Sequence, residues 1–184
     1  MRRPNQLSEA VGVACSALFV LLLLRVVETL TPFQLSHTFG IVPRTGMGLI
    51  GILTAPLLHG NWAHLVANAL PLFVLMTLLY WDKHNDPERT LGMIWLASGA
   101  GTWLIGRPAS HIGASSIVFG LVSYLIMAGV WAGRWRSFFV GLAVFFFFGG
   151  IFIGVLPGNP VVSWEGHLCG AIAGIWAAKK NYLD

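Results

Sequence analysis

The chain has 184 residues, of which 56% are hydrophobic and only 10% are charged, and its mean hydropathy is +0.74. Soluble domains carry about 25% charged residues, so this composition excludes an ordinary soluble protein and indicates a membrane protein. One transmembrane helix takes roughly 20 apolar residues, which leaves room for about six helices and for no separate soluble domain. We therefore predict an all-α, polytopic membrane protein in which residues 1–184 form one transmembrane domain, with a short N-terminal tail of about residues 1–10.

The first predicted helix spans residues 11–27 and follows the basic start MRRPN, an arrangement that in outline imitates a secretory signal. We interpret it as a retained helix. A lipoprotein cysteine follows its apolar run, whereas the run 18–24 comes after Cys15, so lipidation is disfavoured. Cys15 and Cys169 show no paired or metal-type spacing, and we interpret both as small core residues rather than as a disulfide.

Five further apolar runs follow, bounded by charge, proline or glycine, and they predict helices over 56–81, 90–105, 115–131, 138–156 and 165–178. Several are shorter than a full span, which indicates that their ends lie within the bilayer and are covered by neighbouring helices. The long connection 28–55 is rich in Thr, Gly and Pro, and we expect it to lie partly in the membrane interface. The short connection 157–164 contains Gly158 and Pro160.

The distribution of basic residues predicts which side of the membrane the two termini face. Six spans put both termini on one side, and the excess of Lys and Arg on cytoplasmic loops makes that side the cytoplasm. Only Arg44 and Arg107 lie in loops on the other side, and Arg25 lies in the first helix. We therefore predict a multi-pass protein of the cell membrane with both termini cytoplasmic, and the pI of 9.5 needs no nucleic-acid partner to explain it. The basic residues on the side of the termini are Arg2, Arg3, Lys83, Arg89, Arg134, Arg136, Lys179 and Lys180.

Polar side chains inside membrane spans are costly and are candidates for function. The second predicted helix begins LLHGNWAHLVAN and places His59, His64 and Asn68 in its outer half. His64 and Asn68 are four residues apart and share one face, whereas His59 lies to one side. The fourth helix opens with GASSIVFG and contributes Ser115, and the sixth opens with GHLCGAIAG and contributes His167 at the same membrane depth.

Ser115 begins a helix, so its hydroxyl and backbone N–H lie at a positive helix N-terminus, which suits a nucleophile that faces a developing oxyanion. A serine there is more often only a cap, and a lone histidine often only hydrogen-bonds a carbonyl. Here, however, polar residues from three helices converge, and each buried polar group needs a partner. We predict a reaction centre in which His167 is the general base and His64, Asn68 and the Ser115 N–H can donate to the oxyanion.

A stripe of small residues accompanies His167. Gly166, Gly170 and Gly174 repeat every four residues, which lets another helix backbone approach closely. By itself such a stripe indicates packing rather than function.

Other intramembrane chemistries lack their residues. A zinc protease needs H-E-x-x-H, which the sequence does not contain, and an aspartyl mechanism needs two carboxylates in the spans, whereas all three aspartates lie in polar loops or the tail. A metal site built from histidines has no carboxylate or thiolate companion except Cys169. A proton pathway would show acidic residues inside the spans, and only Glu28 and Glu165 lie at helix ends. We predict no metal and no cofactor.

Three motifs resemble those of the rhomboid family. GASS with Phe119 and Gly120 resembles the family's G-x-S-x motif of the fourth helix, HGNWAHLVAN resembles its H-x-x-x-x-H-x-x-x-N in the second, and GHLCGAIAG resembles its G-H-x-x-G-x-x-x-G in the sixth. The resemblance covers essentially the whole chain, because six helices with this motif order form the minimal bacterial type of rhomboid core. It implies a six-helix rhomboid-like bundle.

The resemblance also implies roles for the residues in these motifs. It implies an intramembrane serine protease with a catalytic dyad of Ser115 and His167, and Gly113 belongs to the same serine motif. His64, Asn68 and the Ser115 amide would form the oxyanion hole. His59 would be the accessory histidine.

The sequence departs from the family pattern at three places. Position 116, commonly Gly in the motif, is Ser116, so two neighbouring serines compete for the role that the motif gives to Ser115. Phe119 stands where many members have Tyr, and its ring can stack on His167 without offering a hydroxyl. The family's Trp-Arg pair of the first outer loop is missing before His59, where the chain reads GLIGILTAP, so the docking of this loop can differ.

The predicted function is a serine endopeptidase that hydrolyses a peptide bond in or near the outer half of substrate transmembrane helices. Its partners are transmembrane-helix protein substrates and membrane lipid, and the oligomeric state is left open. A catalytically silent relative that binds transmembrane helices is the alternative, disfavoured because every dyad and oxyanion position holds a competent residue. A channel or transporter is disfavoured because the spans lack paired carboxylates.

Water has to reach the predicted site from outside. We expect the short spans, with the polar side chains of His59, Asn68 and Glu165, to provide a wet cavity. The composition of the connection that holds Gly158 and Pro160 predicts a lid.

Overall fold

The computed structural model describes residues 6–158 and 162–184, and the regular structure there is helical apart from a single bridge between Ile41 and His111. The predicted all-α class is thereby confirmed. The long helices are α1 (Gln6–Leu30), α4 (Trp62–Trp81), α5 (Pro87–Ile105), α6 (Ser115–Trp131), α7 (Trp135–Phe148) and α8 (Trp164–Tyr182). Two shorter helices, α2 (Leu35–Thr38) and α3 (Gly46–Thr54), and three 3-10 turns, η1 (Ala55–Leu57), η2 (Lys83–Asn85) and η3 (Gly149–Val155), complete the described regular structure.

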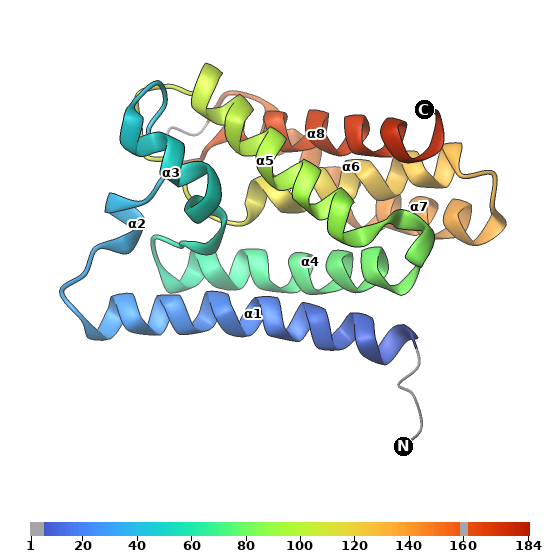
Figure 1. Ribbon diagram of the computed structural model, residues 1–184, viewed down its shortest axis with the longest axis horizontal. Coiled ribbons are helices and arrows are strands. Elements are labelled where there is room, and N and C mark those ends of the chain that lie inside the picture. Colours follow the sequence, from blue (N-terminus) through green and yellow to red (C-terminus); the bar gives the residue numbers. More distant parts are fainter. Residues whose placement is uncertain (1–5, 159–161) are drawn as a thin grey trace.

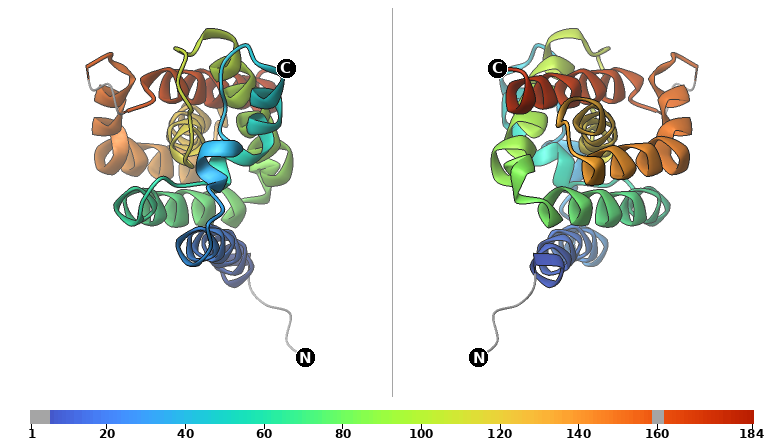
Figure 2. Two further views of the ribbon diagram at one scale, coloured as in Figure 1. Left: turned by 90° about the vertical axis from the view of Figure 1, so that its left-hand side faces the viewer. Right: turned by 90° about the vertical axis from the view of Figure 1, so that its right-hand side faces the viewer.

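The long helices extend along the molecule, and the start of α1 and the end of α8 lie at the same end of it (Figure 1). This end is named the termini end, and the opposite end, where α6 begins, is named the Ser115 end. α6 runs through the middle of the bundle, with α4, α5, α7 and α8 packed around it, while α1 packs on α4 at the outside (Figure 2). The site residues on α6 are therefore held by neighbours on several sides.

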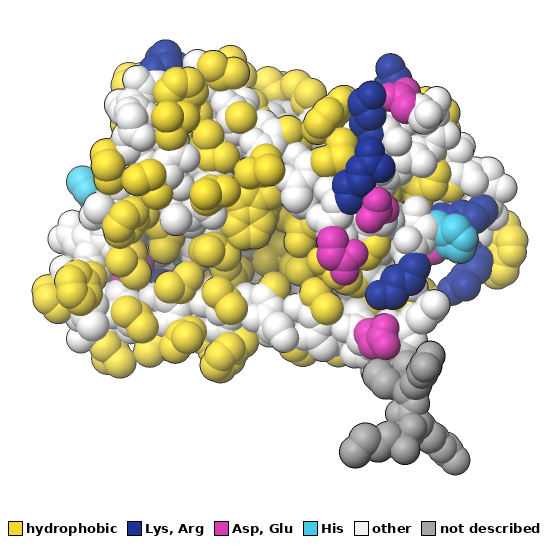
Figure 3. Space-filling view, in the orientation of Figure 1, with side chains coloured by type: hydrophobic (Ala, Val, Ile, Leu, Met, Phe, Trp, Pro, Cys, Tyr) yellow, Lys and Arg dark blue, Asp and Glu magenta, His cyan; other side chains and the backbone are white. Residues whose placement is uncertain are grey.

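Three helical segments are long and apolar enough to cross a membrane, namely Gln6–Leu30, Trp62–Trp81 and Trp135–Val155. Gly46–Leu57 and Ser115–Trp131 are apolar but shorter. α7 exposes large apolar side chains, of which Phe147 is 83% exposed, and hydrophobic side chains cover most of the face away from the termini end (Figure 3). Exposed apolar surface of this extent suits lipid rather than water, in agreement with a membrane protein.

Glycines allow α6 and α8 to pack closely, as the small-residue stripe predicts. A Cβ atom at Gly170 would collide with the backbone carbonyl of Ser116, and one at Gly174 would collide with the carbonyl of Gly120. Because glycine has no side chain, the two backbones touch directly at these points. The predicted close approach is confirmed, and it aligns the first turns of the two helices.

Several helix boundaries differ from the prediction. α4 begins at Trp62 because the side chain of Asn61 accepts a hydrogen bond from the His64 N–H at 2.8 Å and caps the helix. His59 was predicted to lie within the second helix. It lies instead in the turn before α4. The fifth predicted helix consists of α7 followed by η3, which begins at Gly149, and two adjacent glycines weaken an α-helix there. α1 begins at Gln6, inside the predicted tail, because polar residues continue the helix beyond its apolar run.

The connection between α1 and α4 is more ordered than its composition predicts. It contains α2, α3 and η1, and Thr45 caps α3 by accepting a hydrogen bond from the Gly48 N–H. The indole of Trp95 donates to the Ile52 carbonyl at 3.0 Å, and the indole of Trp103 donates to the Thr45 carbonyl at 2.9 Å. Both tryptophans belong to α5, so this helix anchors the connection.

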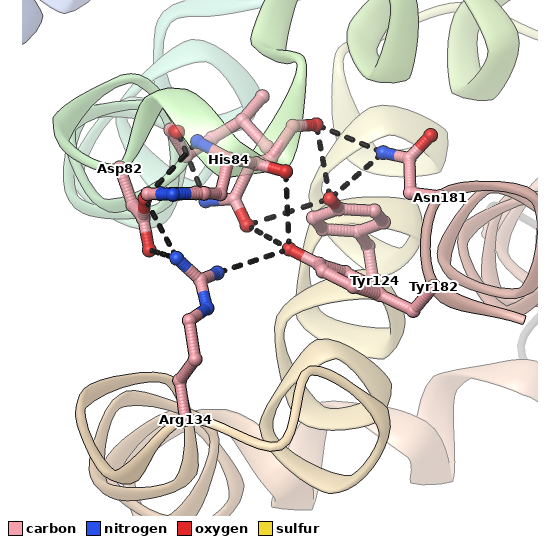
Figure 4. Close-up of polar contacts among 8 residues, drawn as sticks. Asp82, His84, Tyr124, Arg134, Asn181 and Tyr182 are labelled. Carbon is pink, nitrogen blue, oxygen red and sulfur yellow. Dashed lines mark hydrogen bonds and ion pairs between the residues drawn. The ribbon is translucent and has the colours of Figure 1, made fainter.

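A polar network joins four segments at the termini end (Figure 4). The carbonyl of Asn85, in η2, accepts hydrogen bonds from the Tyr124 hydroxyl of α6 at 3.0 Å and from the Asn181 amide of α8 at 2.9 Å. The Asn85 side chain accepts from the Tyr182 hydroxyl at 2.8 Å. Beside it, Arg134 before α7 pairs with Asp82 after α4 at 2.9 Å. The network fixes the bundle at the end away from Ser115.

Candidate active site

The hydroxyl of Ser115 and the imidazole of His167 lie within hydrogen-bond distance. Ser115 is the first residue of α6, and His167 lies in the first turn of α8. Ser115 Oγ is 3.0 Å from His167 Nε2. Among the residues that the structure describes, the Ser116 hydroxyl makes no contact of this kind with a histidine, so the geometry distinguishes the two neighbouring serines.

The second ring nitrogen of His167 determines which tautomer is present. His167 Nδ1 lies 2.9 Å from the carbonyl oxygen of Gly154 in η3. A carbonyl oxygen only accepts, so Nδ1 carries the proton of the neutral ring and Nε2 keeps its lone pair. Nε2 can then accept the proton of the Ser115 hydroxyl. Gly154 was not predicted as a site residue, because any residue can supply a backbone carbonyl and this role leaves no signal in the sequence.

An aromatic ring holds the plane of the His167 imidazole. Phe119 is four residues after Ser115 on α6, and its ring stacks on that of His167 with centroids 4.1 Å apart and an angle of 11° between the planes. Phe152 meets Phe119 edge-on at 6.3 Å. The predicted stacking of Phe119 on His167 is confirmed, and it needs no hydroxyl.

Gly113, His59 and His64 lie at the backbone segment that leads into Ser115. Gly113 has φ +105°, and a Cβ atom there would lie 2.6 Å from the His64 ring, so only glycine fits both the backbone and the ring. The rings of His59 and His64 meet edge-on at 5.0 Å. The Ala114 N–H donates to His59 Nε2 at 3.4 Å. His59, His64 and Gly113 thus surround the backbone directly before Ser115.

Asn68 joins this group only through His64. Its side chain is buried, and Nδ2 donates to the His64 backbone carbonyl at 2.9 Å. This bond uses one of the two N–H groups of the amide and leaves the other for a further acceptor. In the described part of the chain, Asn68 makes no direct contact with Ser115.

A small hollow is lined in part by the two neighbouring serines. It measures about 20 Å³ and is lined by residues that include Ser115, Ser116, Gly113 and His111. This volume accommodates about one water molecule. Within residues 6–158 and 162–184, no group of three or more His, Cys, Asp and Glu side chains could hold a metal ion.

The sequence profile of the rhomboid domain matches residues 46–181, which include all of these residues. The chain belongs to the rhomboid family. An uncharacterized protein of Mycobacterium tuberculosis is 42% identical over 150 residues, covering 76% of this chain and 62% of that protein. One of Mycobacterium leprae is 39% identical over 170 residues, covering 86% and 66%. A protein of Acanthamoeba polyphaga mimivirus, which its name assigns to the rhomboids, is 27% identical over 163 residues and 85% of each chain. The chain therefore spans about three fifths of the length of the Mycobacterium tuberculosis protein.

In this rhomboid, an ion pair holds the start of α8. Glu165 is only 2% exposed, and it accepts from the Arg107 backbone N–H at 3.2 Å and pairs with the Arg107 guanidinium at 3.4 Å. His59 and Asn68 are buried as well. The prediction that these three side chains line a wet cavity is therefore wrong, because each is enclosed by neighbouring segments. The predicted lid lies partly in residues 159–161, outside the described part of the chain.

His111 also holds the start of α8. Its Nε2 donates to the Arg107 carbonyl at 3.1 Å, which leaves Nδ1 to accept from the Ser163 hydroxyl at 2.6 Å. Ser163 caps α8 by accepting from the Gly166 N–H at 3.3 Å. His111 was not predicted as a site residue, and the one signal for it is its place in a loop shortly before the serine motif.

Arg25 connects α1 to the histidine side of the site. Its guanidinium pairs with Glu28 at 3.1 Å and donates to the His59 carbonyl at 3.1 Å. Glu28 in turn accepts from the Ser36 backbone N–H at 2.8 Å. The charge at position 25 thus has a partner, and the bond to the His59 carbonyl positions the turn that carries His59.

Proposed function

We propose that this rhomboid is an intramembrane serine endopeptidase with Ser115 as nucleophile and His167 as general base. One observation carries the proposal, namely the 3.0 Å contact between Ser115 Oγ and His167 Nε2 in a ring whose Nδ1 faces the Gly154 carbonyl. A weak nucleophile such as serine needs a base that accepts its proton, and the neutral Nδ1–H tautomer provides it. No aspartate is required for this arrangement.

The reaction follows from these positions. The Ser115 oxygen attacks the carbonyl carbon of the scissile peptide bond while its proton passes to His167 Nε2. The negative charge on the substrate oxygen faces the Ser115 N–H at the start of α6, with His64 and Asn68 as further donors. His167 then gives the proton to the leaving amine, and an acyl-enzyme on Ser115 remains. A water molecule, deprotonated by His167, hydrolyses that ester and restores the serine.

We propose transmembrane helices as the substrates. The Ser115 end of the bundle would lie in the outer half of the membrane, since the termini end carries most of the basic residues and would face the cytoplasm (Figure 3). In this placement six helices cross the membrane and both termini are cytoplasmic. A substrate helix must unwind before its carbonyls are accessible, so helices with Gly, Ala, Ser or Pro near their outer ends should be preferred.

The test uses the full chain in liposomes with an activity-based serine-hydrolase probe and a panel of single-span substrates. We expect Ser115→Ala and His167→Ala each to abolish labelling and cleavage, because removing the nucleophile or the base removes the reaction. Ser116→Ala is the matched control and should retain both. A chain in which Ser116→Ala rather than Ser115→Ala abolishes labelling would overturn the assignment of the nucleophile.

The alternative of a catalytically silent relative gives a different result in the same experiment. In that case the unaltered chain neither labels nor cleaves, yet it still binds single-span helices. Co-purification of an uncleaved tagged substrate with an unaltered chain that takes up no probe therefore identifies the silent relative.

A further inference from the structure

Two neighbouring hollows lie between α4 and α7 at the termini end, on the side of the molecule away from Ser115. The first, named the apolar hollow, measures about 260 Å³, and its lining includes Leu78, Leu125 and Val140. The second, named the basic hollow, measures about 440 Å³, and its lining includes Lys83 and Arg134. The two hollows adjoin, because both are lined by Trp81, Asp82, Trp135 and Arg136.

The basic hollow has an excess of positive charge. Asp82 is already engaged, because it accepts from His84 and pairs with Arg134 at 2.9 Å (Figure 4). Lys83 is half exposed and lies 3.8 Å from Glu9, a distance at which an exposed pair contributes little. Arg136 stacks over the Trp81 ring at 5.2 Å and, within the described ranges, pairs with no carboxylate. A positive charge at the mouth of the two hollows is thus left without an anion.

The surroundings place this charge beside apolar surface. Arg136 lies in the first turn of α7, whose N-terminal N–H groups have no side-chain cap, and this adds to the positive potential. Trp81 and Trp135 flank the junction of the hollows, as tryptophans do at the level of lipid headgroups. Directly next to them, α7 exposes Phe138 and Phe139. A ligand that fills both hollows needs an anionic group and a hydrocarbon chain in one molecule.

We propose that these hollows bind one anionic phospholipid, with its phosphate at Arg136 and Lys83 and part of an acyl chain between α4 and α7 in the apolar hollow. Basic pockets between transmembrane helices suit anionic headgroups, and the neighbouring apolar hollow provides the space that a free phosphate leaves unused. This site is separate from Ser115 and His167 and stands whether or not the chain is a protease.

The test is a lipid titration of the purified full chain in a neutral detergent, followed by native mass spectrometry. The probes are phosphatidylglycerol, phosphatidylcholine with the same acyl chains, and inorganic phosphate as competitor. We expect one phosphatidylglycerol to bind at least about tenfold more tightly than phosphatidylcholine, since two cations face its headgroup. Inorganic phosphate at equal concentration should not displace it.

Two variants with matched controls locate the site. Arg136→Gln should weaken phosphatidylglycerol binding about fivefold and phosphatidylcholine binding less, because the choline cation offsets the charge of its phosphate. Arg89→Gln, at the same end but outside both hollows, should change neither. Val140→Phe should weaken both lipids by filling the apolar hollow. Val130→Phe, at a position 64% exposed and outside the hollows, is its control.

Three results would overturn the proposal. The first is equal affinity for the two lipids, the second is an equal loss in Arg136→Gln and Arg89→Gln, and the third is full displacement of phosphatidylglycerol by inorganic phosphate. Unchanged lipid binding in Val140→Phe would contradict the assignment of the acyl chain to the apolar hollow.

Discussion

At the scale of single residues, Gly113 is the position where backbone conformation and the site depend on each other most directly. Its φ of +105° strains any residue with a side chain, and a Cβ atom would also displace the His64 ring. We expect Gly113→Ala to lower the rate of serine-probe labelling about tenfold or more, because a shift of the Ser115 turn of about 1 Å is enough for such a loss.

Gly133 provides the control for this substitution. It also has a positive φ, +63°, but nothing lies within 4 Å of the Cβ atom that alanine would add. Gly133→Ala should therefore cost about 1 kcal/mol of stability from backbone strain and leave labelling unchanged. Equal labelling losses in both variants would show that strain alone, and not the contact with His64, is responsible.

Site residues could be predicted from the sequence where the side chain itself acts and stands in a short motif. Ser115 and His167 each stand in a motif of a few residues, and the structure brings them together, while their catalytic roles stay predictions. Gly154 and His111 had no such signal. Gly154 contributes a carbonyl, and His111 contacts the cap of α8 through Ser163, which is distant in the chain.

At the scale of helices, the contact between α6 and α8 determines the distance between the serine and the histidine. A Cβ atom at Gly174 would collide with the Gly120 carbonyl, and the helices would have to separate. We expect Gly174→Ala to destabilise the bundle by about 1–3 kcal/mol and to lower probe labelling. Gly12→Ala on α1, where nothing lies within 4 Å, should leave stability equal or up to about 1 kcal/mol higher. The free energy of unfolding in mixed micelles is measured for both variants. An unchanged free energy of unfolding in Gly174→Ala would contradict the direct contact between the two backbones.

The connection between α4 and α5 should make stability depend on acidic pH. Burial raises the pKa of the Asp82 carboxyl, but hydrogen bonds from His84 and Arg134 outweigh it, and the net effect is a pKa below its usual value. A lowered pKa in the folded state stabilises the fold at every pH above the unfolded value of about 3.9. This contribution is lost as pH falls from there through the folded pKa.

Thermal unfolding of the unaltered chain and of Asp82→Asn checks this dependence. The difference between their midpoints should be constant above about pH 5 and should shrink below about pH 4. Asp86→Asn is the control, because it removes only an exposed ion pair with Arg89 at 3.9 Å. Its unfolding midpoint should differ little from that of the unaltered chain at every pH. A midpoint difference for Asp82→Asn that does not shrink at all as pH falls below about 4 would assign the effect to side-chain shape rather than to charge.

Apolar runs predicted that the six long helices exist, and they predicted the helix bounds least well where a capping, polar or glycine-rich stretch adjoins the run. α6 has the predicted bounds, whereas α2 and α3 were expected to be a loop, because GMGLIGILT has neither charge nor a clear period and is ordered by contacts with α5. η3 was expected to continue α7. The two adjacent glycines with which η3 begins weaken an α-helix there, a local signal that the apolar run of residues 138–156 concealed.

At the scale of the whole molecule, the distribution of charge predicts how the bundle lies in the membrane. Most of the visible Lys and Arg side chains gather at the termini end, and apolar side chains cover much of the remainder of the visible face (Figure 3). Both the start of α1 and the end of α8 lie at that end (Figure 1). Because positive loops stay in the cytoplasm, the connection that precedes α6 should face outward.

Labelling of single cysteines tests this orientation. In a background with Cys15→Ala and Cys169→Ala, Ser110→Cys introduces a thiol at an exposed position before α6, and Asp184→Cys introduces one at the exposed end of α8. We expect a membrane-impermeant maleimide to label Ser110→Cys in intact cells and to label Asp184→Cys only after permeabilisation. The reverse pattern would place Ser115 in the cytoplasmic half of the membrane, and the substrates cleaved would then be cut near their cytoplasmic ends.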